Sequence, residues 1–95
     1  MNYFEELEEA IRNRLRVEIV YSGSVRIVEP HLIGVTFAGN TTLSAFQVSG
    51  SSGDGFRAFV VDRIEGLKIT EEPFHGPRQG YNPNDSMMET ILVRL

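Results

Sequence analysis

Cysteine and tryptophan are both absent from this chain of 95 residues. Without cysteine there is no disulfide framework and no thiolate metal site, which fits a reducing compartment. The length is that of one domain with one modest hydrophobic core. We therefore expect a single domain over residues 1–95.

Long apolar runs are missing as well. Nothing in the chain approaches the roughly 20 apolar residues that cross a bilayer, and the N-terminal segment 1–6 is acidic where a secretion signal would be basic. We expect no membrane partner and a cytoplasmic location. The net charge of −4 argues against binding nucleic acid through a broad basic surface.

Histidine is scarce, which limits the chemistry available. His31 and His75 are the two histidines, and their spacing is not that of metal ligands. No nucleophile-elbow pattern is present, and the paired acids are helix-surface glutamates or Glu71 and Glu72 at a strand end. We therefore expect no metal, no cofactor and no enzymatic activity.

Lysine is scarce too, because Lys68 is the one lysine among nine basic residues and the other eight are arginines. Arginine favours planar, bidentate contacts with carboxylate or phosphate groups. The bias points to recognition of an anion through a few arginines.

Residues 2–14 predict one amphipathic helix. Asn2 is a candidate N-cap, with Glu5 at the capping-box spacing. Apolar residues recur at helical spacing from Phe4 to Leu15 and form a single stripe that docks on a core.

From residue 16 the period of the pattern changes from 3.6 to 2, which predicts β-strands. Gly23-Ser24 is a turn of the II′ hairpin kind, and Pro30 marks a bulge or an edge position because it has no N–H to donate. The glycine-rich segment 50–55 is a hairpin tip, since neither a Lys-Ser/Thr pair nor a helix follows it. The predicted strands are residues 16–22, 25–37, 41–49, 56–61, 67–70 and, at a sheet edge, about 88–95.

Short strands joined by tight turns predict a mainly β fold with one N-terminal helix. A strongly bent five-stranded barrel over about residues 16–72 removes most strand edges, and the helix covers one open end. Residues 73–85 hold three of the four prolines and predict an extended arm, not a second domain.

The segment 56–64 combines arginine with aromatic residues. Arg57 and Phe59 share one face of a predicted strand, and Arg63 follows beside Asp62 at its end. An arginine beside an aromatic ring is suited to stacking and phosphate contact, and Arg26 is a further candidate for the same patch. Alternatively, Arg57 pairs with a surface acid and Asp62 orients Arg63 to close a turn.

An ordered set of short motifs resembles the WYL domain family. The motifs cover roughly residues 7–77, with spacings similar to those of the family. They are Ile19-Val-Tyr21, Arg26-Ile-Val-Glu-Pro30, Leu43-Ser-Ala-Phe46, Arg57-Ala-Phe59, Asp62-Arg-Ile64, and Phe74 with Pro77.

The resemblance implies an Sm-like, SH3-type β-barrel preceded by a helix. In bacteria such domains are usually attached to a helix-turn-helix in transcription regulators, and they are thought to sense single-stranded nucleic acid or a nucleotide-like anion. Matched by position, the family's ligand-binding residues imply Tyr21, Arg26, Phe46, Arg57, Phe59 and Arg63.

The chain departs from the family pattern at its name-giving motif. Thr41-Thr42-Leu43 stands where the family has Trp-Tyr-Leu, so two aromatics that would stack a base are missing. Only about fifteen residues precede the predicted barrel, so we expect a stand-alone, degenerate copy without a helix-turn-helix.

Two functions follow as hypotheses. The first is a non-enzymatic sensor module whose arginine groove binds an anionic ligand, such as single-stranded nucleic acid or a nucleotide. The alternative is an interaction or self-assembly module, a homodimer through barrel strand edges or a complex with another protein, in which no small ligand takes part.

Overall fold

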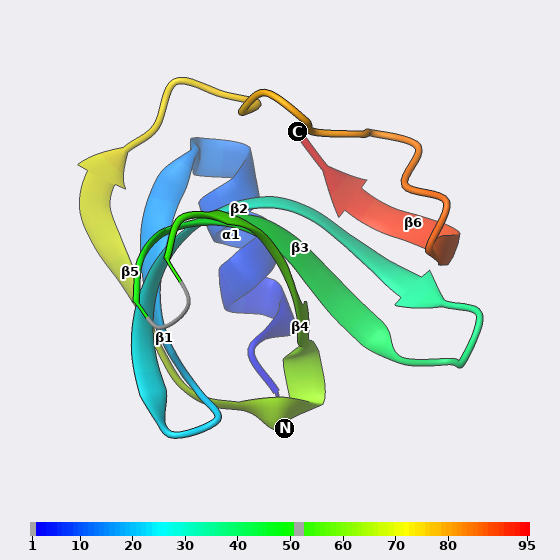
Figure 1. The fold of residues 1–95 in the computed structure, drawn as a ribbon, viewed down its shortest axis with the longest axis horizontal. Coiled ribbons are helices and arrows are strands. Elements are labelled where there is room, and N and C mark those ends of the chain that lie inside the picture. The colour runs from blue at the N-terminus through cyan, green and yellow to red at the C-terminus, as the bar shows by residue number, and fades with distance from the viewer. Residues whose placement is uncertain (1, 51–52) are drawn as a thin grey trace.

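The described part of the chain forms one α-helix, one short 3-10 helix and six strands (Figure 1). The structure, a computed structural model, describes residues 2–50 and 53–95. In chain order the elements are α1 (Phe4–Asn13), β1 (Leu15–Tyr21), β2 (Ser24–Thr36), β3 (Thr41–Ser49), β4 (Gly55–Val60), the short 3-10 helix η1 (Val61–Arg63), β5 (Ile64–Pro73) and β6 (Met88–Arg94).

Helix α1 begins two residues later than the predicted helix 2–14. The N-cap residue is Tyr3 and not the predicted Asn2, although the Oδ1 of Asn2 accepts the N–H of Phe4 at 3.0 Å. The helix ends where Arg14 adopts a left-handed conformation with φ 53°. Leu7, Ala10 and Ile11 form its buried face, as the apolar stripe indicates.

The strands pair antiparallel in the order β4-β3-β2-β1-β5, and β6 also pairs with β2. Strand β2 changes partner along its length: β1 pairs with it up to Val28, and β6 pairs with it from Leu32 onward. Between these points the register against β3 shifts, so that His31 is the extra residue of a bulge next to Pro30. Of the two positions predicted for Pro30, a bulge or a strand edge, the structure shows the bulge.

The sheet is strongly curved but does not close into the five-stranded barrel that the sequence predicts (Figure 1). Its path ends at β4 and β5, and these two strands do not pair within the described residues. A side chain bridges this opening: the hydroxyl oxygen of Tyr21, at the end of β1, accepts the N–H of Val60, at the end of β4, at 3.0 Å. The fold is mainly β with one N-terminal helix and an open sheet of six strands.

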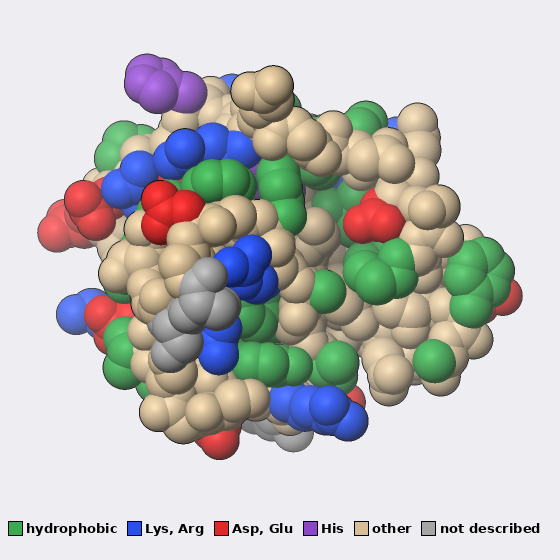
Figure 2. Space-filling view, in the orientation of Figure 1, with side chains coloured by type: hydrophobic (Ala, Val, Ile, Leu, Met, Phe, Trp, Pro, Cys, Tyr) green, Lys and Arg blue, Asp and Glu red, His purple; other side chains and the backbone are tan. Residues whose placement is uncertain are grey.

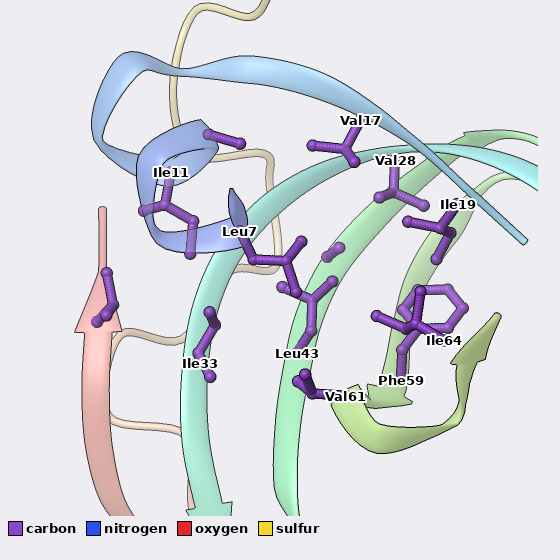
Figure 3. Close-up of a cluster of buried hydrophobic side chains, with 13 residues drawn as sticks. Leu7, Ile11, Val17, Ile19, Val28, Ile33, Leu43, Phe59, Val61 and Ile64 are labelled. Carbon is purple, nitrogen blue, oxygen red and sulfur yellow. The ribbon is translucent and has the colours of Figure 1, made fainter. Parts of the chain in front are cut away.

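The core lies on the concave face of the sheet. Leu7 and Ile11 point from α1 toward β2 and β3, where they meet Ile33 and Leu43 (Figure 3). Inward positions of the next strands, such as Phe59, continue this apolar layer. Helix α1 thereby covers part of the concave face, and the remaining part carries polar groups.

A long connection, residues 74–87, leads from β5 to β6 across one end of the sheet (Figure 1). It corresponds to the predicted arm and is fixed at its start, where the N–H of Phe74 donates to the carbonyl of Arg14 at 2.9 Å. No helix of residues 2–50 and 53–95 is long and apolar enough to span a bilayer.

Candidate functional site

Strand alternation places four of the six predicted ligand-binding residues on the concave face. Paired residues of antiparallel strands point to the same side, and Arg57 pairs with the buried Ala45 while Arg26 pairs with the buried Ile19. Tyr21 and Phe59 complete this group, and Gln47, which is fully buried, lies among them. We call Tyr21, Arg26, Gln47, Arg57 and Phe59 the inner cluster.

Two aromatic rings form the base of the inner cluster. Tyr21 and Phe59 meet edge to face with ring centroids 5.0 Å apart. The guanidinium carbon of Arg26 lies 5.8 Å from the Tyr21 centroid and 5.7 Å from the Phe59 centroid, within the range of a cation–π contact.

Gln47 links the two arginines of the inner cluster. Its Oε1 accepts Nη1–H of Arg26 at 3.3 Å, and its Nε2–H donates to the carbonyl of Gly53 at 2.8 Å. That same carbonyl accepts Nη2–H of Arg57 at 3.2 Å. Two positive charges are thus held along one network that runs through a buried amide.

None of the described residues is a counter-ion of Arg26. Its Nε–H is buried without a hydrogen bond to any described residue, and no carboxylate of the described residues forms an ion pair with it. An unpaired buried donor costs about 1–3 kcal/mol, so such a group calls for an explanation beyond packing.

Glycines at both ends of the β3–β4 connection make room for these side chains. A Cβ on Gly50 would lie 3.0 Å from Cγ of Arg26, and one on Gly55 would lie 2.9 Å from Nη1 of Arg57. Both glycines also have positive φ, 135° and 140°, where a side chain is disfavoured.

The remaining two predicted site residues lie elsewhere. Phe46 alternates with the inward-facing Ala45 and Gln47, so it lies on the opposite, outer face and packs edge to face on Phe56 at 5.5 Å. Arg63 is exposed in η1, one residue before Ile64, which pairs with Tyr21. Arg63 therefore lies next in the chain to the partner of Tyr21, at the margin of the inner cluster and not within it.

The outer face carries a second charged group, centred on a buried carboxylate. Glu29 is only 1% exposed. Its carboxylate accepts Nε–H and Nη2–H of Arg78 at 2.7 and 3.0 Å, and Nε–H of Arg16 at 3.0 Å. The guanidinium carbon of Arg78 also lies 4.4 Å from the ring centroid of Phe46.

A pocket of about 440 Å³ opens beside this group, and we call it the outer pocket. Arg16 and Arg78 line it together with Glu29, and the start of the 74–87 connection forms its other wall. Burial would raise the pKa of Glu29, but the hydrogen bonds and charges of Arg78 and Arg16 outweigh burial and hold that pKa below its ordinary value.

His31 ties the connection to the sheet. Its Nδ1 lies 2.7 Å from the carbonyl oxygen of Glu29, and its Nε2 accepts the main-chain N–H of Arg78 at 3.0 Å. The ring stacks on Phe74 with centroids 5.6 Å apart. Burial lowers the pKa of His31, so the neutral ring with its proton on Nδ1 fits both hydrogen bonds.

Sequence reasoning did not select Gln47 or the group around Glu29. The signal for Gln47 was present, because it follows Leu43 and Ala45 at the inward positions of β3. A polar residue at an inward position of a period-2 pattern is a candidate for a buried polar contact. Arg78 gave no such signal, since only the path of the connection brings it to Glu29.

Figure 2 shows how arginine and lysine side chains are placed on one face of the molecule. On the face in Figure 2 they form several separate groups, with hydrophobic side chains between them. The described residues contain no cluster of three or more His, Asp or Glu side chains suited to a metal ion.

Comparison with protein families matches the WYL domain over residues 2–69. No curated protein and no solved structure matched the chain. The matched residues include α1, most of β5 and every residue of the inner cluster. WYL domains are in general ligand-sensing regulatory modules rather than enzymes. This chain belongs to the WYL domain family.

Proposed function

We propose that this chain is a non-enzymatic regulatory module that binds an anionic ligand at the inner cluster. The observation that carries the proposal is Arg26, a partly buried cation whose buried Nε–H has no hydrogen bond and whose charge has no counter-ion among the described residues. An anion at the cluster would compensate that charge.

The rings of the inner cluster favour a ligand with a flat face. Tyr21 and Phe59 surround the guanidinium of Arg26, and the combination of arginine with aromatic rings is common where proteins bind single strands. A nucleotide or a short single-stranded nucleic acid offers both a phosphate and a base. Thr41 and Thr42 lie on β3 in place of the family's aromatics, so phosphate contacts would supply more of the affinity than base stacking.

Binding to a fluorescein-labelled single-stranded oligonucleotide, measured by anisotropy at several salt concentrations, tests the proposal. We expect Arg26→Gln to weaken binding about tenfold and to lower the salt slope by about 0.7, the share of one phosphate contact on a single strand. Arg12→Gln is the matched control, because Arg12 is an exposed arginine of α1 paired with Glu8 at 2.8 Å.

Competition with mononucleotides shows whether a single nucleotide is enough to occupy the inner cluster and displace the oligonucleotide. If Arg26→Gln and Arg57→Gln both bind as tightly as the unmodified chain, with the same salt slope, the inner cluster is not the binding site. No binding of oligonucleotide or nucleotide at low salt would remove nucleic acid as the ligand class.

The alternative function, self-association, is supported by β6. This strand pairs only with β2 among the described strands, so its other edge is open, and its Leu92 side chain is 47% exposed. Open edges are sites for strand addition. Sedimentation velocity tests it: a dimer that Leu92→Lys converts to a monomer supports edge pairing, and a monomer at all concentrations excludes it.

A further inference from the structure

We propose that the outer pocket is a second ligand site, which takes a small organic oxyanion, a carboxylate or a phosphate ester that carries an apolar group. It lies on the face of the sheet opposite the inner cluster. Arg78 and the connection that walls the pocket lie outside residues 2–69, the part that matches the family.

The guanidinium groups at the outer pocket are only partly used by Glu29. Arg16 donates only its Nε–H to Glu29. The two terminal amino groups of Arg16, Nη1 and Nη2, have no hydrogen bond to a described residue. Nη1 of Arg78 is likewise without such a bond. Since the side chains of Arg16 and Arg78 remain 29% and 40% exposed, these donors are accessible to an incoming oxyanion.

Charge at the outer pocket favours an anion. Arg16 and Arg78 share one buried carboxylate, which leaves one net positive charge. Asp54 acts on Arg78 through its charge, but Arg14 brings another guanidinium to the rim, where its Nη1–H donates to the carbonyl of His75 at 2.9 Å.

The outer pocket is pre-formed because Glu29 fixes its arginines. Two N–H groups of Arg78 meet the two carboxylate oxygens, which sets the plane of that guanidinium, and Phe46 supports it from one side. Donors held in this way lose little conformational entropy when a ligand binds.

The size and walls of the outer pocket define the ligand. About 440 Å³ lies within the range of small-molecule sites, about 300–1,000 Å³. Pro73, Phe74 and Pro77 provide apolar wall next to the arginines. A bare inorganic ion would leave that wall unused, so an anion with an attached ring or short aliphatic group fits better.

Titration of the 15N-labelled chain with phenyl phosphate, benzoate, inorganic phosphate and phenol tests the proposal by NMR. We expect phenyl phosphate or benzoate to shift the Nε–H signals of Arg16 and Arg78 and the main-chain amides of residues 74–78 in a saturable way. Inorganic phosphate should bind at least severalfold more weakly, and phenol should leave these signals unchanged. The tighter of the two aromatic anions identifies the preferred head group.

Variants at Arg16 separate binding from folding. Arg16→Gln should weaken the tighter anion at least tenfold while the signals of residues 74–78 stay in place, because the Arg78–Glu29 pair remains. Arg16→Lys, which keeps the charge but not the planar fork, should bind with intermediate strength. Arg12→Gln is the control and should bind as the unmodified chain does.

Three results would overturn the outer pocket as a ligand site. The first is the absence of saturable shifts with either aromatic anion at millimolar concentration. The second is equal binding by Arg16→Gln in a folded variant. The third is a pattern of shifts confined to Arg26 and its neighbours, which would place the anion at the inner cluster instead.

Discussion

The main-chain N–H of Arg78 donates to Nε2 of His31 at 3.0 Å, and on the other side of the ring Nδ1 lies 2.7 Å from the carbonyl of Glu29. One imidazole therefore joins the connection before β6 to the bulge of β2. Protonation of Nε2 would replace its lone pair with an N–H, so that the bond from Arg78 would be lost. The attachment of the connection thus depends on a neutral ring.

Acid is expected to destabilise the fold through His31. Burial lowers its pKa in the folded chain below the ordinary value of 6.5, so the unfolded chain binds the proton more readily. The contribution of the neutral ring is fully present above about pH 6.5 and is lost as the pH falls from there toward the folded pKa. One such group accounts for at most about 1.4 kcal/mol per pH unit.

Urea unfolding between pH 8 and pH 5 measures this effect. The free energy of unfolding should stay nearly constant above pH 7 and decline below about 6.5. His75→Asn, at an exposed histidine, should keep the decline, whereas His31→Gln should reduce it. A profile of the unmodified chain that is flat down to pH 5 would show that His31 does not control the attachment.

Loss of the buried carboxylate should destabilise the chain as well. In Glu29→Gln the neutral amide cannot neutralise Arg16 and Arg78, and it can accept fewer charge-assisted bonds. We expect a loss of about 2 kcal/mol, less than for a fully buried pair because both arginines are partly exposed. Chemical denaturation at pH 7 measures it.

The control for Glu29→Gln is Glu8→Gln, which breaks the exposed pair with Arg12 on α1. Surface pairs of this kind contribute about 0.3–0.5 kcal/mol. Equal losses in the two variants would mean that the carboxylate of Glu29 contributes no more than a surface charge. The carboxylate also has an acid limit: its pKa is lowered from 4.5, so its stabilisation is present above that pH and is lost below it.

Most of the secondary structure follows from local pattern. Alternating β-branched residues predict the strands. The first hairpin turn lies one residue earlier than predicted: its two residues are Ser22 and Gly23, with φ 52° and 72°, as in a type I′ turn and not the predicted II′, and Ser24 already begins β2.

The predicted length of β5 was too short: the strand runs from Ile64 to Pro73, whereas the prediction covered residues 67–70. The polar stretch before Pro73 gives no apolar alternation. It lies between two residues paired with β1, Ile69 and Pro73, and the hydroxyl of Thr70 donates to the carbonyl of Arg16 at 2.7 Å.

The grouping of side chains across strands was less predictable than the strands themselves. A one-residue change of register moves every side chain of a strand to the other face, and the bulge at His31 makes such a change between β2 and β3. Phe46 and Arg57 were also grouped by motif order alone, but Arg57 pairs with Ala45, the neighbour of Phe46, so the two face opposite sides of the sheet. The outer pocket could not be predicted from the sequence, because it forms only where residues 74–78 cross back to Glu29 in the folded chain.

Gly34 is expected to be required for the pairing of β6 with β2. A Cβ at this position would lie 2.7 Å from the carbonyl oxygen of Thr90 and 2.8 Å from Sδ of Met88. Because the nearest atom belongs to the backbone, Gly34→Ala must push β6 away, at a cost of about 1–3 kcal/mol. Hydrogen exchange should show faster exchange of the β6 amides than in the unmodified chain.

Gly66→Ala provides the matched control for Gly34→Ala. Its added Cβ would meet Val20 at 3.5 Å, an ordinary contact distance, so stability should be unchanged or slightly higher. If Gly34→Ala leaves the exchange of β6 as slow as Gly66→Ala does, the close approach of β6 to β2 in this structure is not needed for the strand.

The hydroxyl of Tyr21 is expected to stabilise the open side of the sheet, where it accepts the N–H of Val60. Tyr21→Phe retains the ring contact with Phe59 but leaves that N–H without its partner, which should cost about 1 kcal/mol. Tyr3→Phe is the control, since no hydrogen bond of the Tyr3 hydroxyl to a described residue is found. The exchange rate of the Val60 amide is the local measure, and it should rise in Tyr21→Phe alone. Faster exchange in both variants would trace the effect to α1 packing, and unchanged exchange in Tyr21→Phe would mean that another group protects the end of β4.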